Sequence, residues 1–358
     1  MIISFIFKNF GTWEVSMQKN IDKLRHITEI LLNPEDDYVQ LTKAIDDLYS
    51  LFLSTSRLEV DDTENRDDVY LSKGKAIGTT WAAMCVKELM RTKYFLRGLY
   101  AGIKAAQERF PNTCIHILYA GTGPFATLAM PMTTVFTSDE INFTFLEINP
   151  ISIQHLKRNI NAFNALDYVN DIIQCDATTY LADNIMPIHI VLTETMQNAL
   201  QKEPQVSIAM NLVPQMVSGG FLIPQNIEIS AVLMSPKKVT ERLTNPDFGN
   251  QKYYHTLKTI FELNKSTLTD CAVKSNLDDT YAFPEVIVEL PSDIDSDYSD
   301  LNLLTNIQVF GDVELTNYQC SLNMPKRLVL LNKESATSNK ISFEYVISDT
   351  PGFKYKFV

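Results

Sequence analysis

The sequence of 358 residues predicts an α/β protein: a Rossmann-like nucleotide-binding domain, preceded by a helical extension and followed by a β-rich, barrel-like domain. Two observations predict this class. The stretch 115–150 reads as strand, glycine turn, helix and second strand, the unit that binds nucleotides. From Thr267 onward, short alternating apolar segments are typical of an antiparallel sheet or barrel. We therefore expect the helical extension at 1–67, the nucleotide-binding domain at 68–235 and the β-rich domain at 236–358.

The nucleotide-binding unit begins with an expected strand at Ile115–Tyr119, where apolar residues alternate. Gly121-Thr122-Gly123-Pro124 breaks that strand, and a helix is expected from Phe125, because proline is tolerated in a first helical turn. The next strand, Asn142–Leu146, delivers Glu147. Glycines let a ligand approach the backbone, and a carboxylate at the second strand end can accept both ribose hydroxyls.

Two cofactors use this geometry. Gly121, Gly123 and Ala126 satisfy the dinucleotide pattern G-x-G-x-x-(G/A), and Glu147 follows Ala126 near the expected spacing of about 20 residues. S-adenosylmethionine, whose adenosine is held in a similar way, is the other candidate. The glycine pattern alone is compatible with both.

Composition narrows the function classes. The formal net charge of −12 argues against a general nucleic-acid binder, because no basic face is available to neutralise phosphates. Five cysteines without C-x-x-C spacing indicate neither a disulfide framework nor a metal site, and they predict a reducing, cytoplasmic compartment. The apolar opening MIISFIF is too short for a secretory core and is expected as a short strand or an over-extended start. No membrane partner is expected.

The region before the glycine turn is expected to be mostly helical. Met17–Leu53 predicts two amphipathic helices, interrupted at Asn33-Pro34, that serve packing or oligomerisation. Asp68–Trp81 is expected as a loop that closes over a site. Ala82–Arg109 reads as a long helix that carries three cations, Arg91 among them. A cofactor with a carboxylate would need one of these cations to bind it.

Acidic residues also follow later expected strands. Asp171–Cys175 ends in Asp176, which can accept the amino group of an adenine. The buried strand Pro187–Leu192 runs into a loop that carries Glu194 and Glu203. Two carboxylates at the carboxyl end of a strand could form a pincer for a planar guanidinium, and an ordinary solvated loop is equally compatible with them.

The rest of the chain completes the two domains. We expect a helix at Val206–Met216, a turn at Gly219-Gly220 and a strand at Ile227–Leu233, an ending that dehydrogenases rarely show. Pro236–Leu263 is polar, and we expect a helix within it. Further strands are expected at Val286–Leu290, Leu303–Val309, Tyr318–Leu322, Leu328–Leu331 and Ile341–Val346.

Taken in order, four blocks between Tyr70 and Pro236 resemble the protein arginine methyltransferase family: MRTKYF, YAGTGPF with FLEINP, TETMQNALQKE and SGGFLIP. The G-x-G-P form is similar to the branch of that family that makes symmetric dimethylarginine. The resemblance implies a class I methyltransferase domain followed by a β-barrel, with S-adenosyl-L-methionine as the cofactor.

The resemblance also implies roles for individual residues. Arg91 would bind the methionine carboxylate of the cofactor, and Gly121 and Gly123 would form the turn beneath it. Glu147 would hold the ribose hydroxyls, and Asp176 would lie by the adenine. Glu194 and Glu203 match the catalytic, substrate-binding pair of glutamates that holds the guanidinium, and no metal is needed.

The sequence also departs from the family. The Thr-His-Trp loop has no clear counterpart, Thr316-Asn317-Tyr318 being the nearest, and Tyr119 replaces the usual first-strand acid. These departures favour a small substrate, as in bacterial relatives that methylate free arginine. The prediction is an S-adenosylmethionine-dependent N-methyltransferase acting on the omega nitrogen of free L-arginine, with a protein arginine N-methyltransferase as the alternative. An NAD-dependent oxidoreductase and a catalytically silent partner-binding module are alternatives of other classes, and a homodimer is expected.

Overall fold

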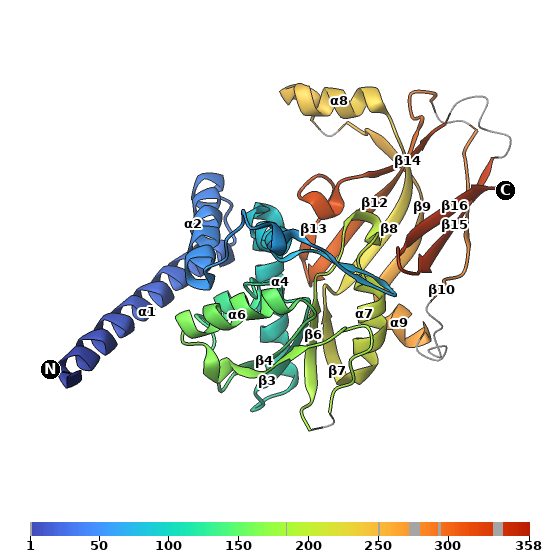
Figure 1. Cartoon of the computed structure of the whole chain (residues 1–358). Coiled ribbons are helices and arrows are strands. Elements are labelled where there is room, and N and C mark those ends of the chain that lie inside the picture. Colours follow the sequence, from blue (N-terminus) through green and yellow to red (C-terminus); the bar gives the residue numbers. More distant parts are fainter. Residues whose placement is uncertain (1, 184, 250, 272–279, 293–294, 332–338) are drawn as a thin grey trace.

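The computed structural model describes residues 2–183, 185–249, 251–271, 280–292, 295–331 and 339–358. Figure 1 shows the parallel sheet in the lower centre, two N-terminal helices on one side of it and antiparallel strands on the other. None of the helices in the described residues combines the length and apolar content needed to cross a membrane.

The parallel sheet has five strands in the order β5-β4-β3-β6-β7, and each neighbouring pair is parallel. The strands are β3 (Ile115–Ala120), β4 (Ile141–Glu147), β5 (Val169–Gln174), β6 (Ile188–Thr193) and β7 (Met216–Ile223). Counted from β3 this is the 3-2-1-4-5 order of doubly wound sheets, so the Rossmann-like prediction is confirmed. Such sheets bind ligands at the carboxyl ends of their strands, where the order reverses beside β3.

Helices cover the parallel sheet and connect it to the rest of the molecule. They are α3 (Thr79–Met84), α4 (Leu89–Arg109), α5 (Ala129–Met132), α6 (Pro150–Ala162) and α7 (Gln205–Leu212). The helix α6 begins where the sequence favours it, with Asn149 accepting from the Ile151 N–H as the N-cap and Pro150 in the first turn. The helix α4 packs on both the parallel sheet and the strand β12 (Asp300–Phe310), so it lies between the two domains.

The two expected N-terminal helices are present as α1 (Ile2–Leu32) and α2 (Tyr38–Ser56). Because α1 already begins at Ile2, the expectation of a short opening strand is wrong. The pair packs on the nucleotide-binding domain: the ring of Phe52 lies 5.3 Å from that of Phe125. Between the helices, Asp36 forms an ion pair with the fully buried Lys93 of α4.

The C-terminal strands are all paired antiparallel, as the alternating pattern predicts. One sheet joins β8 (Asn226–Met234), β9 (Tyr254–Asn264), β12, β13 (Val313–Leu315) and β14 (Lys326–Leu330); the other joins β10 (Tyr281–Ala282), β11 (Val286–Glu289), β15 (Lys340–Ile347) and β16 (Gly352–Phe357). Within the described residues the strands therefore form two sheets instead of one closed sheet. Along the chain, β8 is the first strand of the antiparallel sheets. The expected boundary at 235/236 falls just after the end of this strand.

Two expectations for individual segments are wrong, and a third segment contains a strand that was not expected. Gly219 and Gly220 lie inside β7 and do not form the expected turn. A Cβ at Gly220 would lie 2.9 Å from the His189 carbonyl oxygen of β6, so only glycine allows β6 to approach this closely. The helix expected in the polar stretch after Pro236 is present as α8 (Pro236–Thr244), and the strand β9, which was not expected, follows it. The expected strand Tyr318–Leu322 is a turn followed by a short 3₁₀ helix.

The remaining elements are short. They are β1 (Val69–Leu71), β2 (Gly74–Ala76), α9 (Lys265–Cys271) and the 3₁₀ helices η1 (Thr63–Arg66), η2 (Cys85–Lys87), η3 (Leu166–Tyr168), η4 (Asn198–Leu200), η5 (Val213–Gln215), η6 (Pro246–Phe248) and η8 (Ser321–Asn323). The strands β1 and β2 form a hairpin within the segment that was expected to be a loop.

Candidate active site

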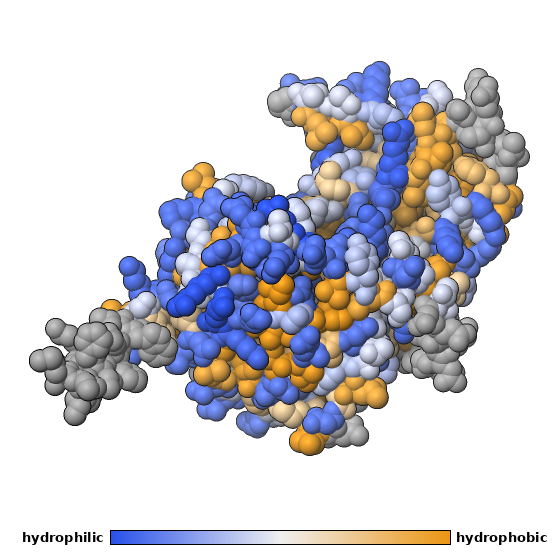
Figure 2. Space-filling model, in the orientation of Figure 1, coloured by the Kyte–Doolittle hydropathy of each residue, from blue (hydrophilic) through white to orange (hydrophobic). Residues whose placement is uncertain are grey.

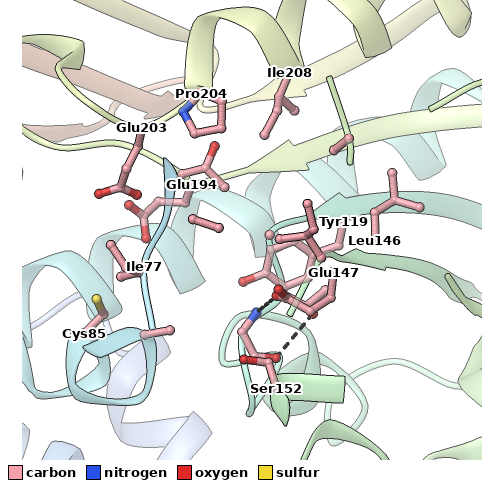
Figure 3. Close-up of a pocket in the computed structure, with 18 of the residues that line it drawn as sticks. Ile77, Cys85, Tyr119, Leu146, Glu147, Ser152, Glu194, Glu203, Pro204 and Ile208 are labelled. Carbon is pink, nitrogen blue, oxygen red and sulfur yellow. Dashed lines mark hydrogen bonds between the residues drawn. The ribbon is translucent and has the colours of Figure 1, made fainter. Parts of the chain in front are cut away.

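A pocket lies at the carboxyl ends of β3, β4 and β6, the edge at which doubly wound sheets bind their ligands. All of the predicted site residues line it: Arg91, Gly121, Gly123, Glu147, Asp176, Glu194 and Glu203. In Figure 3, Glu194 and Glu203 lie on one side of the pocket and Glu147 on the other. Lys75 and Ile77, from the segment expected to close over a site, form part of its wall.

The glycine turn at the bottom of the pocket has left-handed backbone. The φ angles are +75° at Gly121 and +61° at Gly123, and a Cβ at Gly121 would lie 2.2 Å from the Cγ2 atom of Thr195. Glycine is therefore required at 121 both for conformation and for space. Ala126 is also left-handed, at +44°, and this ends any helical run from Phe125. The helix expected at Phe125 begins only at Ala129, in α5, so that expectation is wrong.

Glu147 ends β4 and points at the glycine turn. Its Oε2 atom accepts from the Gly123 N–H at 2.7 Å, and its Oε1 atom accepts from the Asn149 N–H at 2.9 Å. Burial raises the pKa of Glu147, and these backbone N–H groups oppose the rise. Each carboxylate oxygen can accept a further hydrogen bond, so Glu147 can bind a ligand hydroxyl without leaving the turn.

Asp176 follows β5 at the same edge of the sheet. Its Oδ1 atom accepts from the Thr178 N–H at 2.8 Å, which fixes the side chain. In the described part of the chain, its Oδ2 atom makes no hydrogen bond, so this oxygen can accept one from a ligand. The glycine turn, Glu147 and Asp176 thus form an end of the pocket that fits the donors of a nucleoside.

The loop between Glu194 and Glu203 connects β6 to α7 and is conformationally strained. Ala199, Leu200 and Lys202 have φ angles of +54°, +53° and +66°, in the region that residues with a Cβ rarely adopt. Such residues cost about 1–3 kcal/mol each and persist where the surroundings hold them.

The antiparallel sheets hold this loop in place. Three hydrogen bonds do so: Ala199 N–H to Thr305 Oγ1, Tyr345 Oη to the Leu200 carbonyl, and Lys202 N–H to the Pro351 carbonyl, each 2.8 Å long. The C-terminal domain therefore positions the two glutamates, although it contributes no side chain to the pocket wall in the described residues.

Glu194 binds the guanidinium of Arg91. Nη2 of Arg91 lies 2.7 Å from both carboxylate oxygens and Nε lies 3.1 Å from Oε2, so both oxygens of Glu194 accept from one planar group. Burial alone would lower the pKa of Arg91, but the surrounding negative charges, that of Glu194 first and that of Glu88 as well, act together with the hydrogen bond to Glu194 and raise that pKa well above its ordinary value. The two side chains form a buried ion pair.

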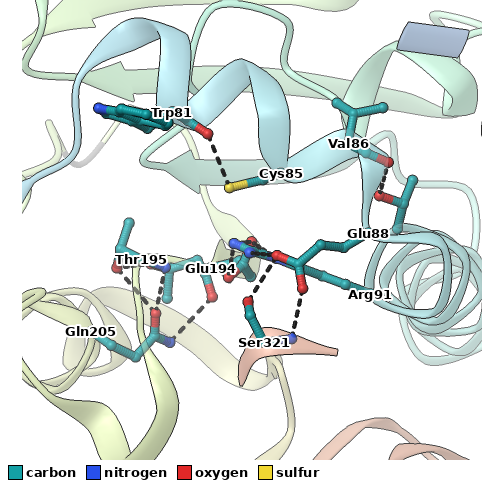
Figure 4. Close-up of polar contacts among 11 residues, drawn as sticks. Trp81, Cys85, Val86, Glu88, Arg91, Glu194, Thr195, Gln205 and Ser321 are labelled. Carbon is teal, nitrogen blue, oxygen red and sulfur yellow. Dashed lines mark hydrogen bonds and ion pairs between the residues drawn. The ribbon is translucent and has the colours of Figure 1, made fainter. Parts of the chain in front are cut away.

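A second carboxylate, Glu88, completes the surroundings of Arg91 (Figure 4). Glu88 accepts from Nη1 of Arg91 at 2.8 Å and from the backbone N–H and hydroxyl of Ser321 at 2.7 and 2.8 Å. This chain of contacts joins η8 of the C-terminal domain to Glu194. Glu88 was not among the residues predicted from the sequence. Its spacing of three residues before Arg91 on a helix is the signal that could have found it, whereas nothing local in the sequence points to Ser321.

Glu203 is in a different electrostatic state from Glu194. Its side chain is buried and has no ion pair within the described residues. Burial and then the negative charge of Glu194 raise the pKa of Glu203 to about 7. Burial also raises the pKa of Glu194, but the guanidinium of Arg91, held by both of its oxygens, opposes that rise and favours the ionised form. Glu203 has no such partner in the described residues and can take up or release a proton near neutral pH.

The pocket does not favour thiol chemistry. Burial raises the pKa of both Cys85 and Cys175, which line it, to about 11. Both are protonated at neutral pH and are poor nucleophiles. In the part of the chain that the structure describes, no group of three or more His, Cys, Asp or Glu side chains is arranged to hold a metal ion.

The fold and the site together define a Rossmann-like domain whose pocket holds two glutamates, Glu203 buried and Glu194 partly buried. No family model and no curated protein matches the chain. Among solved structures, the chain is similar to the Trypanosoma brucei PRMT1 enzyme-prozyme heterotetrameric complex with AdoHcy, with a TM-score of 0.46 and 11% identity over 73% of this chain and 85% of that one. It is also similar to the crystal structure of PRMT6, with a TM-score of 0.46 and 10% identity over 73% of this chain and 96% of that one.

Proposed function

We propose that this protein is an S-adenosylmethionine-dependent N-methyltransferase that acts on a guanidino group, with the omega nitrogen of free L-arginine as its target. One observation carries the proposal. Glu194 already binds a planar guanidinium, that of Arg91, through both carboxylate oxygens, and Glu203 lines the same pocket. The geometry and charge that a substrate guanidinium requires are therefore present in the chain itself.

The other end of the pocket fits the cofactor. Gly121 and Gly123 line this end of the pocket, Glu147 can accept the ribose hydroxyls, and Asp176 has an oxygen for the adenine amino group. Arg91 can bind the carboxylate of the methionine part. When bound, S-adenosylmethionine supplies an activated methyl group on a sulfonium.

The two glutamates would bind, orient and deprotonate the substrate. Glu194, ionised, holds the positive charge of the guanidinium, and its two oxygens fix the plane of that group. A guanidinium nitrogen that gains a methyl group must lose a proton. Glu203, with a pKa of about 7, is suited to accept it near neutral pH.

The choice of free arginine rests on the charge of the pocket wall. Of the described residues that line the pocket, Lys75 is the cation that remains besides Arg91. It is oriented by Asp68, with Nζ 2.5 Å from Oδ2. Its other two N–H donors can bind the α-carboxylate of an amino acid, a group that an internal arginine of a peptide does not have.

The proposal is tested by incubating the protein with labelled S-adenosylmethionine and, separately, L-arginine, agmatine and an arginine-containing peptide. We expect label on L-arginine, with less on agmatine, which lacks the carboxylate. Label on the peptide alone would identify a protein arginine N-methyltransferase instead. Label on none of the three would overturn the proposed function.

A further inference from the structure

We propose that Gln205 is a positioning residue that fixes Glu194 and Glu203 relative to each other by joining the two ends of the loop that carries them. The importance of this relative position for catalysis rests on the proposed function, whereas the restraint of the loop by Gln205 does not. Gln205 is the first residue of α7 and lies two positions after Glu203. Its side chain is 1% exposed and does not line the pocket, so it acts from behind the glutamates.

Gln205 forms hydrogen bonds to the residues that precede and follow Glu194 in the chain. Its Oε1 atom accepts from the N–H of Thr195 at 2.8 Å and from the Thr195 hydroxyl at 3.0 Å, and its Nε2 atom donates to the Thr193 carbonyl at 3.1 Å. Thr193 and Thr195 are the two neighbours of Glu194 in the chain. Figure 4 shows Gln205 facing this segment, on the side of Thr195.

The chemistry of these partners requires an amide at this position. A backbone N–H can only donate and a backbone carbonyl can only accept, so the group between them must present an acceptor to Thr195 and a donor to Thr193. Glutamine supplies both, whereas glutamate supplies only the acceptor and methionine supplies neither. The amide orientation is fixed by these two backbone groups, which removes the usual ambiguity between its oxygen and nitrogen.

The restraint links the two carboxylates through a short path. Glu194 lies between the two threonines that Gln205 binds, and Glu203 is separated from Gln205 only by Pro204. The loop between the glutamates contains three left-handed residues and would relax if its ends were released. Movement of one glutamate relative to the other by about 1 Å would be enough to lower the turnover of a bound guanidinium by about a hundredfold.

The experiment compares Gln205→Met with the wild type, using Gln215→Met as the matched control. Gln215 also makes three amide hydrogen bonds, to Ala182, Tyr180 and Asn211, but none of these partners lies in the segment that carries Glu194 and Glu203. Hydrogen exchange of the Thr195 amide and steady-state kinetics with L-arginine are measured on all three proteins. For Gln205→Met alone we expect faster exchange at Thr195, a fall in kcat of about ten- to a hundredfold and unchanged binding of S-adenosylhomocysteine.

The two measurements separate this inference from the proposed function. If the wild type methylates no guanidine, the proposed function fails, and the exchange rate at Thr195 still tests the restraint. Unchanged exchange at Thr195 in Gln205→Met would overturn the inference, and so would unchanged kcat in an active protein. Should Gln205→Met not fold, Gln205→Glu keeps the Thr195 acceptor but cannot donate to Thr193. A lower kcat in that variant would support the inference, and wild-type kinetics would overturn it.

Discussion

Arg91 and Glu194 form a buried ion pair in which both carboxylate oxygens accept from one guanidinium, with Nη2 of Arg91 2.7 Å from each. The side chains are only 10% and 13% exposed, so the pair is shielded from solvent. It joins a residue expected to contact the cofactor to a residue expected to contact the substrate. Binding at the two ends of the pocket should therefore be coupled.

The first prediction concerns this coupling. A substrate guanidinium can use both oxygens of Glu194 only if Arg91 leaves or shares them, and a carboxylate ligand for Arg91 makes this easier. We expect L-arginine to bind about tenfold more tightly, or better, when S-adenosylhomocysteine is present. Calorimetric titrations with and without S-adenosylhomocysteine measure the difference. Equal dissociation constants would show that the ion pair does not couple the two ends.

Glu194 and Glu203 should differ in their contribution to stability. Glu194→Gln leaves the buried guanidinium of Arg91 without its main counter-charge, at a cost of about 3–5 kcal/mol in the free energy of unfolding. Glu203→Gln removes a carboxylate that burial already disfavours, so we expect little loss at neutral pH. Both variants should abolish turnover and leave cofactor binding largely intact. Urea unfolding and a methyl-transfer assay measure these effects, and equal destabilisation of the two variants would contradict the assignment of charges.

The raised pKa of Glu203 makes stability depend on pH. The folded protein holds this proton up to about pH 7, whereas the unfolded chain releases it near 4.5. Stability from this group is therefore present below the unfolded pKa and is lost as pH rises to about 7, by roughly 3 kcal/mol. Glu203→Gln should lack this decline when unfolding is measured from about pH 5 to about pH 8. Identical pH dependence of unfolding in the two proteins would argue against the raised pKa.

Glu147→Ala should weaken cofactor binding. The variant removes a charged acceptor for the ribose hydroxyls and leaves the N–H groups of Gly123 and Asn149 without their partner. Glu140→Ala is the matched control, because that exposed glutamate also accepts from a local backbone N–H, that of Thr137, but does not line the pocket. We expect calorimetry to show at least tenfold weaker binding of S-adenosylhomocysteine for Glu147→Ala and no change for the control. If Glu147→Ala bound normally, the nucleoside would lie elsewhere.

The Rossmann-like class of the fold and the meeting of the site residues at one pocket were predictable from the sequence for a physical reason. Strands in a doubly wound sheet end at one edge, so residues that follow them, such as Glu147, Asp176 and Glu194, are brought together whatever the loops do. The position of Glu203 was predictable because the loop after β6 must lead to a helix that starts at the same edge of the sheet, and Glu203 lies at the end of that loop.

What the sequence did not predict depends on contacts between distant residues. Most residues of β9 are exposed or only partly buried, so the strand contains many polar residues. The alternation of apolar and polar residues that indicates a strand was therefore not recognised there. Ala126 adopts a left-handed conformation that its residue type does not favour, and this shortens the expected helix. The pairing of Arg91 with Glu194 joins residues 103 positions apart, and no local pattern encodes it.

The most direct test of the central claim is mass spectrometry of L-arginine after incubation with S-adenosylmethionine and either the wild type or Glu203→Gln. The account predicts a product with one or more methyl groups on guanidino nitrogens, formed by the wild type and absent with Glu203→Gln. A methyl group on the α-nitrogen or the carboxylate, or equal product from both proteins, would contradict it.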